Sequence, residues 1–269
     1  MEELVHLLKL TQKELKIELY NDLKFLKMNP LYGDGFLYAK GKLPVLLVAH
    51  MDTVFDVPEN IYSNKKEDII YNQHGGLGGD DRCGIYIILK LLEQYRPHVL
   101  FTEDEEIGCV GAMKATKNLA APDVKYIIEF DRKGKNDCVF YSCHNKKFID
   151  YIESFGFIQN FGTFSDISVL GSRWDIAAVN LSCGYYHEHT PYEHIIFSET
   201  INTLNKAKNM LHASKKAPYF SYHTQDLDED TEYKNNMFQR MLAYYYDEIH
   251  DYYTDHFTRN KNPKNKGGK

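Results

Sequence analysis

The sequence predicts a three-layer α/β/α fold, in which a mixed, mostly parallel central sheet lies between two layers of helices. Apolar segments of strand length alternate along the chain with longer segments of helical periodicity, a pattern typical of parallel strands joined by crossover helices. Metal-ligating side chains follow several of the predicted strands. The 269 residues, 43% hydrophobic and 26% charged, are enough for one large domain with a buried core.

The elements of the first half follow from their hydrophobic patterns. Residues 1–27 carry apolar side chains at helical spacing and predict one amphipathic helix. Residues 33–50 predict a hairpin-like pair of strands, the second of them a buried central strand at 45–49. A short strand is expected at 68–73. A helix is expected from about Asp81, because apolar residues recur there three and four positions apart.

The second half repeats this alternation. Residues 98–103 predict a strand and residues 111–119 a helix. The apolar segment 124–131 predicts a strand that ends at Asp131, and 145–156 a helix closed by Gly156. A strand at 174–184 and a long helix at 192–213 complete the predicted fold.

The composition changes near residue 217. Residues 1–216 are expected to form a single domain. Residues 217–269 are expected to be an appended extension, rich in Tyr and Asp, with helical periodicity between Met237 and Tyr252 and a basic tail. We expect its helix to dock on the domain or on another subunit.

Charge and cysteine content limit the classes of function. A formal net charge of -6 argues against nucleic acid as a partner, and no apolar run is long enough to cross a membrane. The N-terminus lacks the pattern of a signal peptide. The five cysteines are scattered and odd in number, which favours reduced thiols and a cytoplasmic location. Cys138 and Cys143 are an alternative zinc pair, although a role as core thiols is favoured.

Histidine and acidic side chains gather where the predicted strands end. In an open α/β sheet, ligands bind beyond the carboxyl ends of the strands, so these residues are expected to meet. They are His50 and Asp52, Asp80 and Asp81, Glu105 and Glu106, Asp131, and His187 and His189.

A divalent metal explains such a cluster. Neighbouring carboxylates raise one another's pKa, and burying them without a counter-charge is costly. Imidazole and carboxylate ligands suit zinc, with manganese or cobalt as alternatives, and three carboxylates with two histidines suffice for two metals. In the Glu105–Glu106 pair, one glutamate can face the metal and the other can take a proton from water. Taken singly, each motif also has a simpler interpretation as a helix cap, a turn or an exposed acidic face.

Five short motifs, in this order along residues 46–211, resemble a known family. The stretches HMD, GGDDRCG, EDEEIG, EFD and HTPYE are similar to those of the co-catalytic di-zinc exopeptidases and amidohydrolases of the M20, M28 and M42 group. The stretches GDDRCG and DEEIG are the most specific. The resemblance implies the zinc-exopeptidase-like (phosphorylase/hydrolase-like) fold.

The resemblance also implies a role for each motif residue. Two zinc ions would be bound, with Asp80 bridging them. Glu105 would be the general base and acid, and Asp52 would hold the imidazole of His50. His187 is a rival to His189 as the last ligand. The implied metal ligands are His50, Asp80, Glu106, Asp131 and His189.

One departure from the family concerns the lid. Only 57 residues separate Asp131 from His189, too few for the lid domain of many M20 members. Residues 1–216 are therefore expected to be a catalytic domain without a lid insertion. Substrate contacts that a lid would provide must come from other groups, and the candidates are Arg132, His144, Tyr185 and Tyr186. The stretch FGTFSDIS resembles the family's GTD or GSD segment, so Asp166 is a candidate for contact with a substrate amine, with a helix cap as an equal alternative.

The expected function is hydrolysis of peptide bonds in small peptides, of the aminopeptidase or dipeptidase type. An N-acyl amino acid deacylase or a carboxypeptidase on the same site is the alternative within the enzymes. A catalytically silent peptidase-like assembly protein is the alternative outside them. The expected partners are a small peptide or an N-acyl amino acid, and a homo-oligomer is possible; neither nucleic acid nor a membrane is expected.

Overall fold

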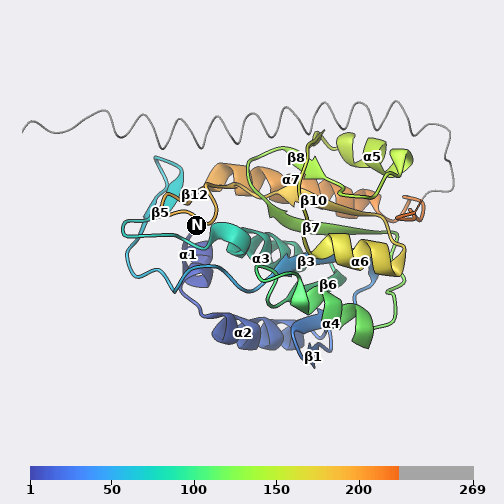
Figure 1. Ribbon diagram of the computed structural model, residues 1–269, viewed down its shortest axis with the longest axis horizontal. Coiled ribbons are helices and arrows are strands. Elements are labelled where there is room, and N and C mark those ends of the chain that lie inside the picture. Colours follow the sequence, from blue (N-terminus) through green and yellow to red (C-terminus); the bar gives the residue numbers. More distant parts are fainter. Residues whose placement is uncertain (224–269) are drawn as a thin grey trace, which may run out of the picture. The chain divides into compact units, whose positions relative to one another are not determined.

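The computed structural model describes residues 1–223, and its centre is an eight-stranded sheet (Figure 1). The strands occur in the order β1-β2-β6-β3-β7-β10-β8-β9. The central strands β6, β3, β7 and β10 are mutually parallel, whereas β1, β2 and β8 join through antiparallel pairs. The bounds are β1 Leu31–Gly33, β2 Phe36–Ala39, β3 Leu43–His50, β6 Pro97–Thr102, β7 Tyr126–Arg132, β8 Asp137–Val139, β9 Ile158–Gln159 and β10 Ala178–Ser182.

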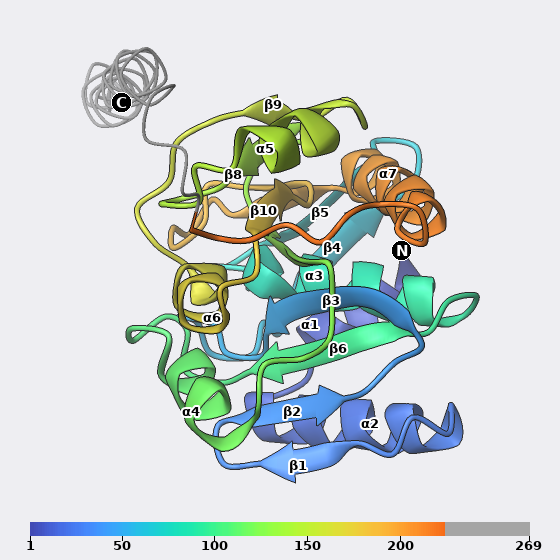
Figure 2. The ribbon, with the colours of Figure 1, turned by 90° about the vertical axis from the view of Figure 1, so that its right-hand side faces the viewer.

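Helices cover both faces of this sheet. Figure 2 shows α4 and α6 on one side, and α2, α3 and α7 on the other. The bounds are α1 Glu2–Leu8, α2 Gln12–Phe25, α3 Gly79–Leu92, α4 Val110–Asn118, α5 Lys146–Glu153, α6 Asp166–Trp174 and α7 Phe197–Ala213. The predicted three-layer α/β/α fold with a mixed, mostly parallel sheet is confirmed.

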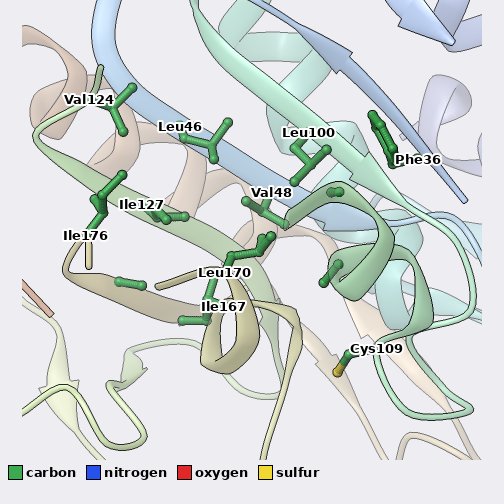
Figure 3. Close-up of a cluster of buried hydrophobic side chains, with 13 residues drawn as sticks. Phe36, Leu46, Val48, Leu100, Cys109, Val124, Ile127, Ile167, Leu170 and Ile176 are labelled. Carbon is green, nitrogen blue, oxygen red and sulfur yellow. The ribbon is translucent and has the colours of Figure 1, made fainter. Parts of the chain in front are cut away.

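Buried side chains on both faces explain why the central strands are continuous apolar runs. Leu46 and Val48 of β3 belong to a cluster with Leu100 of β6 and Ile127 of β7, packed against residues of α4 and α6 (Figure 3). Successive strand residues point to opposite faces, so Leu47, also fully buried, faces the layer of α3. The rigid centre of the sheet therefore fixes the strand ends where the polar residues begin.

A second, smaller sheet lies beside the domain core. It is antiparallel, in the order β11-β12-β5-β4. The pairing of Ile195 with Ile70 ties the segment after His189 to the segment before Asp80. Its strands are β4 Ile61–Asn64, β5 Ile69–Asn72, β11 Tyr185–Tyr186 and β12 His194–Ile196.

Three predicted elements are wrong in detail. The helix expected at 1–27 is two helices, because Thr11 begins α2 with a capping box to Glu14. The strand at 36–39 pairs with β1 and β6 and forms no hairpin with β3. The long helix begins at Phe197, since residues 194–196 pair with β5. In the last two cases a distant strand supplied the partner, which a local pattern does not reveal.

The last described residues still pack on the domain. Phe220 is buried, and its ring lies 5.1 Å from that of Phe148 and 5.4 Å from that of Tyr151. The helix predicted between Met237 and Tyr252 lies outside the described residues. Within residues 1–223, no helix is long and apolar enough to cross a membrane.

Candidate metal centre

The polar residues at the strand ends come together at one edge of the parallel sheet. His50 is the last residue of β3, and Asp131 lies near the end of β7. Glu105 and Glu106 follow β6, and His189 follows β10 and β11. His50, Glu105, Glu106 and Asp131 lie at the carboxyl ends of parallel strands, where α/β folds place their ligand sites, whereas His189 follows a strand of the smaller antiparallel sheet.

The carboxylate of Asp80, at the start of α3, lies between the two histidines. Its Oδ1 is 2.9 Å from Nε2 of His50, and its Oδ2 is 3.4 Å from Nε2 of His189. Asp131 Oδ1 is 3.4 Å from Nε2 of His50, and Glu106 Oε1 is 2.9 Å from Nε2 of His189. The five predicted ligands therefore form two groups that share Asp80.

The orientation of His50 fits a bound cation. Its Nδ1 faces Asp52 Oδ1 at 3.3 Å, and its Nε2 faces the carboxylates of Asp80 and Asp131. Burial alone would lower the pKa of His50, but these three carboxylates raise it well above its usual range, so this position favours positive charge. A bound cation would supply that positive charge and leave Nε2 free to act as a ligand. Ligand atoms of His50, Asp80 and Glu106 lie within 4.8 Å of one another, as do those of His50, Asp81 and Asp131.

The raised pKa values of the acidic groups also indicate a site that favours a bound cation. Burial, and then the charge of Asp131, raise the pKa of Asp80 to about 7. Burial likewise raises the pKa of Asp81 well above its usual range. Divalent cations at these positions would favour the ionised carboxylates.

Asp52 holds three parts of the centre at once. Besides facing His50, it accepts the backbone N–H of Glu105 at 3.1 Å and that of Glu106 at 3.0 Å. Burial alone would raise its pKa, but the hydrogen bond with His50 and the two N–H groups lower it to about 2. Asp52 therefore stays ionised and joins the end of β3 to the loop that carries both glutamates.

Glu105 lies beside the metal-binding groups without belonging to either. Its side chain is buried, and the thiol of Cys109 is 3.8 Å from its Oε1. Burial, and then the charge of Asp131, raise the pKa of Glu105 to about 9. A carboxyl group whose pKa is raised in this way holds and releases a proton near neutral pH once nearby cations moderate the shift.

Asp81 has a structural use that the sequence left open. Its Oδ1 accepts the backbone N–H of Gly84 at 2.9 Å, and its Oδ2 that of His50 at 3.3 Å. The carboxylate thus satisfies a free N–H group at the start of a helix and tethers the end of β3.

Two residues that support Asp131 were missed by the sequence reasoning. The side-chain amide of Asn180 accepts the backbone N–H of Asp131 at 2.8 Å and donates to its carbonyl at 2.7 Å. Ser165 donates to Asp131 Oδ2 at 3.0 Å and also contacts the buried carboxyl of Glu129. The only sequence signal was a polar residue inside a buried strand, Asn180 in AVNLS.

The further candidates for substrate contact differ in position. Tyr185 donates to Asp131 Oδ1 at 3.3 Å, whereas Tyr186 donates to Glu199 at 2.6 Å. Asp166 is fully buried against Thr102. His187 is exposed, with its ring 5.5 Å from that of His194.

The remaining candidates, Arg132 and His144, belong to neither group of metal-ligating side chains. A guanidinium nitrogen of Arg132 is 4.0 Å from Asp137, and His144 is partly buried. Cys138 and Cys143 are buried thiols. Among residues 1–223, neither cysteine belongs to a group of three side chains that could hold a metal.

Comparisons by sequence with known protein families and with curated proteins find no match. Solved structures do match. A tripeptidase from Staphylococcus aureus has a TM-score of 0.65 at 14% identity, over 80% of this chain and 97% of that one. The aminopeptidase PepT from Bacillus cereus has a TM-score of 0.63 at 15% identity, with the same coverage. A protein assigned as a Zn-dependent exopeptidase, from Bacteroides vulgatus, has a TM-score of 0.52 at 12% identity, over 74% and 85% of the two chains.

Proposed function

We propose that this chain, which has the fold of the zinc exopeptidases, is a metal-dependent peptidase of the aminopeptidase or dipeptidase type that acts on small peptides. One observation carries the proposal. The carboxylate of Asp80 offers one oxygen to His50 and the other to His189, with Glu105 buried beside them. This is the arrangement that two metals sharing a carboxylate require.

The chain's own residues suit two zinc ions, with manganese or cobalt as alternatives. His50 and Asp131 would hold one ion, Glu106 and His189 the other, and Asp80 both. When bound, the ions supply Lewis acidity that polarises the substrate carbonyl and makes water easier to deprotonate.

Glu105 moves the proton in this proposal. Its carboxylate takes a proton from the attacking water and gives it to the leaving nitrogen. Asp52 keeps the imidazole of His50 oriented and, through the backbone N–H of Glu105, fixes the base at the same time. The side chain of His50 is 1% exposed and that of His189 is 49% exposed, so the substrate would approach from the side of His189.

The charge of the centre favours a substrate with a free amine. Two divalent ions would balance four of the six carboxylates, and the buried guanidinium of Arg82, which is attracted to Asp81 and Asp52, balances one more. The remaining negative charge attracts a protonated amine and repels a terminal carboxylate. The carboxylates counted are Asp52, Asp80, Asp81, Glu105, Glu106 and Asp131. The charge of the centre therefore favours aminopeptidase or dipeptidase activity over carboxypeptidase or N-acyl amino acid deacylase activity.

Further proposals concern the location, the domain organisation and the oligomeric state of the enzyme. Five buried thiols support a reducing, cytoplasmic location. Residues 1–216 are proposed as the catalytic unit and 217–269 as an extension that docks on it or on a second copy. Homo-oligomers are common among small exopeptidases of the group that the motifs resemble. Light scattering on the full chain measures the oligomeric state directly.

A substrate panel tests the proposed function. Aminoacyl anilides and dipeptides are compared with N-acetylated amino acids and N-blocked dipeptides, each with zinc and with EDTA. We expect zinc-dependent cleavage of the substrates with a free amine. Cleavage of the N-acyl substrates alone would support the deacylase, and zinc-bound protein that cleaves none of them would support the silent assembly protein.

A further inference from the structure

Glu193 is a buried carboxylate that contacts the backbone of the segment leading to Asp80. It lies four residues after His189, and 1% of its surface is exposed. Its Oε2 accepts the backbone N–H of Leu77 at 3.0 Å and that of Gly78 at 2.6 Å. Its Oε1 accepts the backbone N–H of Asp80 at 3.0 Å.

These three donors would otherwise have no partner in a helix. All three lie before the regular part of α3, because the backbone angles of Asp80 and Asp81 are not helical, so these N–H groups have no acceptor in a preceding turn. Gly78 has φ +76°, a left-handed conformation that turns its N–H toward the same carboxylate. Charged acceptors make shorter and stronger hydrogen bonds than neutral ones, so Glu193 fixes this backbone more firmly than an amide would.

One short segment therefore fixes Asp80 in two ways. His189 contacts the carboxylate of Asp80 from the solvent side, and Glu193 holds its backbone from the buried side. The segment is itself anchored, because β12, which begins at His194, pairs with β5. The distances from the Asp80 carboxylate to His50 and to His189 therefore depend on Glu193, whose hydrogen bonds go to the backbone of residues 77–80.

We propose that Glu193 is a positioning residue for the shared metal ligand, holding the backbone of Asp80 so that one carboxylate oxygen faces His50 and the other faces His189. This inference rests on the proposed function, since it assigns Asp80 to both metals. It assigns a role in metal binding to Glu193, a residue that is not one of the proposed metal ligands.

The test replaces the carboxylate with an amide of the same shape. In Glu193→Gln, one oxygen becomes an NH₂ group that faces backbone donors and accepts nothing. We expect zinc affinity, measured by competition with a chromophoric chelator, to fall by about 10–100-fold. We also expect kcat to fall more than KM rises, and the metal-free protein to stay folded with a lower melting temperature, because buried N–H donors lose an acceptor.

Glu199→Gln is the matched control. Glu199 lies six residues further along the chain and accepts a hydrogen bond from Tyr186, and it makes no contact with the segment before Asp80. It should bind zinc as the wild type does. Equal zinc affinity in Glu193→Gln, Glu199→Gln and the wild type would overturn the inference.

A second variant keeps Glu193 and displaces it. A Cβ at Gly79 would lie 3.2 Å from Glu193 Oε1 and 3.0 Å from Cγ1 of Ile195, so Gly79→Ala should push the carboxylate aside and weaken zinc binding in the same direction. This variant decides the question if Glu193→Gln fails to fold, and wild-type affinity in Gly79→Ala would then count against the inference. The two proposals fail separately: wild-type protein that binds zinc and cleaves no substrate contradicts the function, not the positioning role.

Discussion

Asp52 Oδ1 lies 3.3 Å from Nδ1 of His50, and this contact sets which ring nitrogen faces the metal positions. The same carboxylate accepts the backbone N–H groups of Glu105 and Glu106. A change at Asp52 therefore disturbs the imidazole and the base together.

Asp52→Asn should lower both kcat/KM and zinc affinity by about 10–100-fold, since an amide NH₂ would oppose N–H donors that now meet a carboxylate. Steady-state kinetics and chelator competition measure the two losses. Asp56→Asn, an exposed acid in the same loop, is the control and should change neither. A variant with reduced zinc affinity and unchanged kcat/KM would show that Asp52 does not orient the reaction.

Glu105→Gln should keep the metal and lose hydrolysis. The amide cannot carry the proton, and general acid–base catalysis contributes about 10²–10⁴-fold. Zinc content by elemental analysis and kcat on an aminoacyl anilide separate binding from catalysis. Asp104→Asn, the neighbouring acid, should stay active. Full activity in Glu105→Gln would remove Glu105 as the base.

His189→Ala and His187→Ala form a pair that distinguishes the two histidines. His189 contacts Glu106 and Asp80, whereas the ring of His187 lies against that of His194. We expect His189→Ala to lose about one zinc equivalent per chain and His187→Ala to retain both. The reverse result would reassign the last ligand to His187.

The metal-free protein should lose stability as the pH rises. Burial raises the pKa of Asp80 from 3.8 to about 7, so the folded state binds this proton more tightly than the unfolded state. The resulting stabilisation is complete below pH 3.8 and is lost as the pH rises through about 7. Bound zinc replaces the proton. The gap in melting temperature between the zinc-loaded and EDTA-treated protein should therefore widen as the pH rises from about 4 to about 7. A gap that stays constant over this range would contradict the account.

The same linkage predicts that zinc binding releases protons. Titration calorimetry at neutral pH, in buffers of different ionisation enthalpy, measures the number released. We expect about one proton or more per chain, because Asp80 and Glu105 both have raised pKa values. Heats that are independent of the buffer would argue against protonated carboxyl groups at the centre.

The sequence was sufficient for the α/β/α layers because the central strands are buried on both faces and read as continuous apolar runs. It was also sufficient for the convergence of His50, Glu106 and Asp131, because parallel strands bring their carboxyl ends to one edge. Asp80 and His189 reach the same place through segments that the antiparallel pairing of β5 and β12 joins. Whether these side chains hold metal remains a prediction that the experiments above address.

The pairing partners of two strands and the hydrogen-bond partners of single polar residues could not be predicted from the sequence. The strand at 36–39 and residues 194–196 pair with segments distant in the chain, and local periodicity does not encode that choice. Asn180 and Glu193 act through backbone N–H and C=O groups of other segments, which any sequence provides. Their roles become visible only when the backbone positions are known.

Zinc content of the wild type and of Asp80→Ala, measured together by elemental analysis, tests the central claim most directly. Because Asp80 faces both histidines, the account predicts about two zinc equivalents per chain in the wild type and less than one in folded Asp80→Ala. Two equivalents retained in Asp80→Ala, or a metal-free wild type that hydrolyses peptides in EDTA, would contradict it.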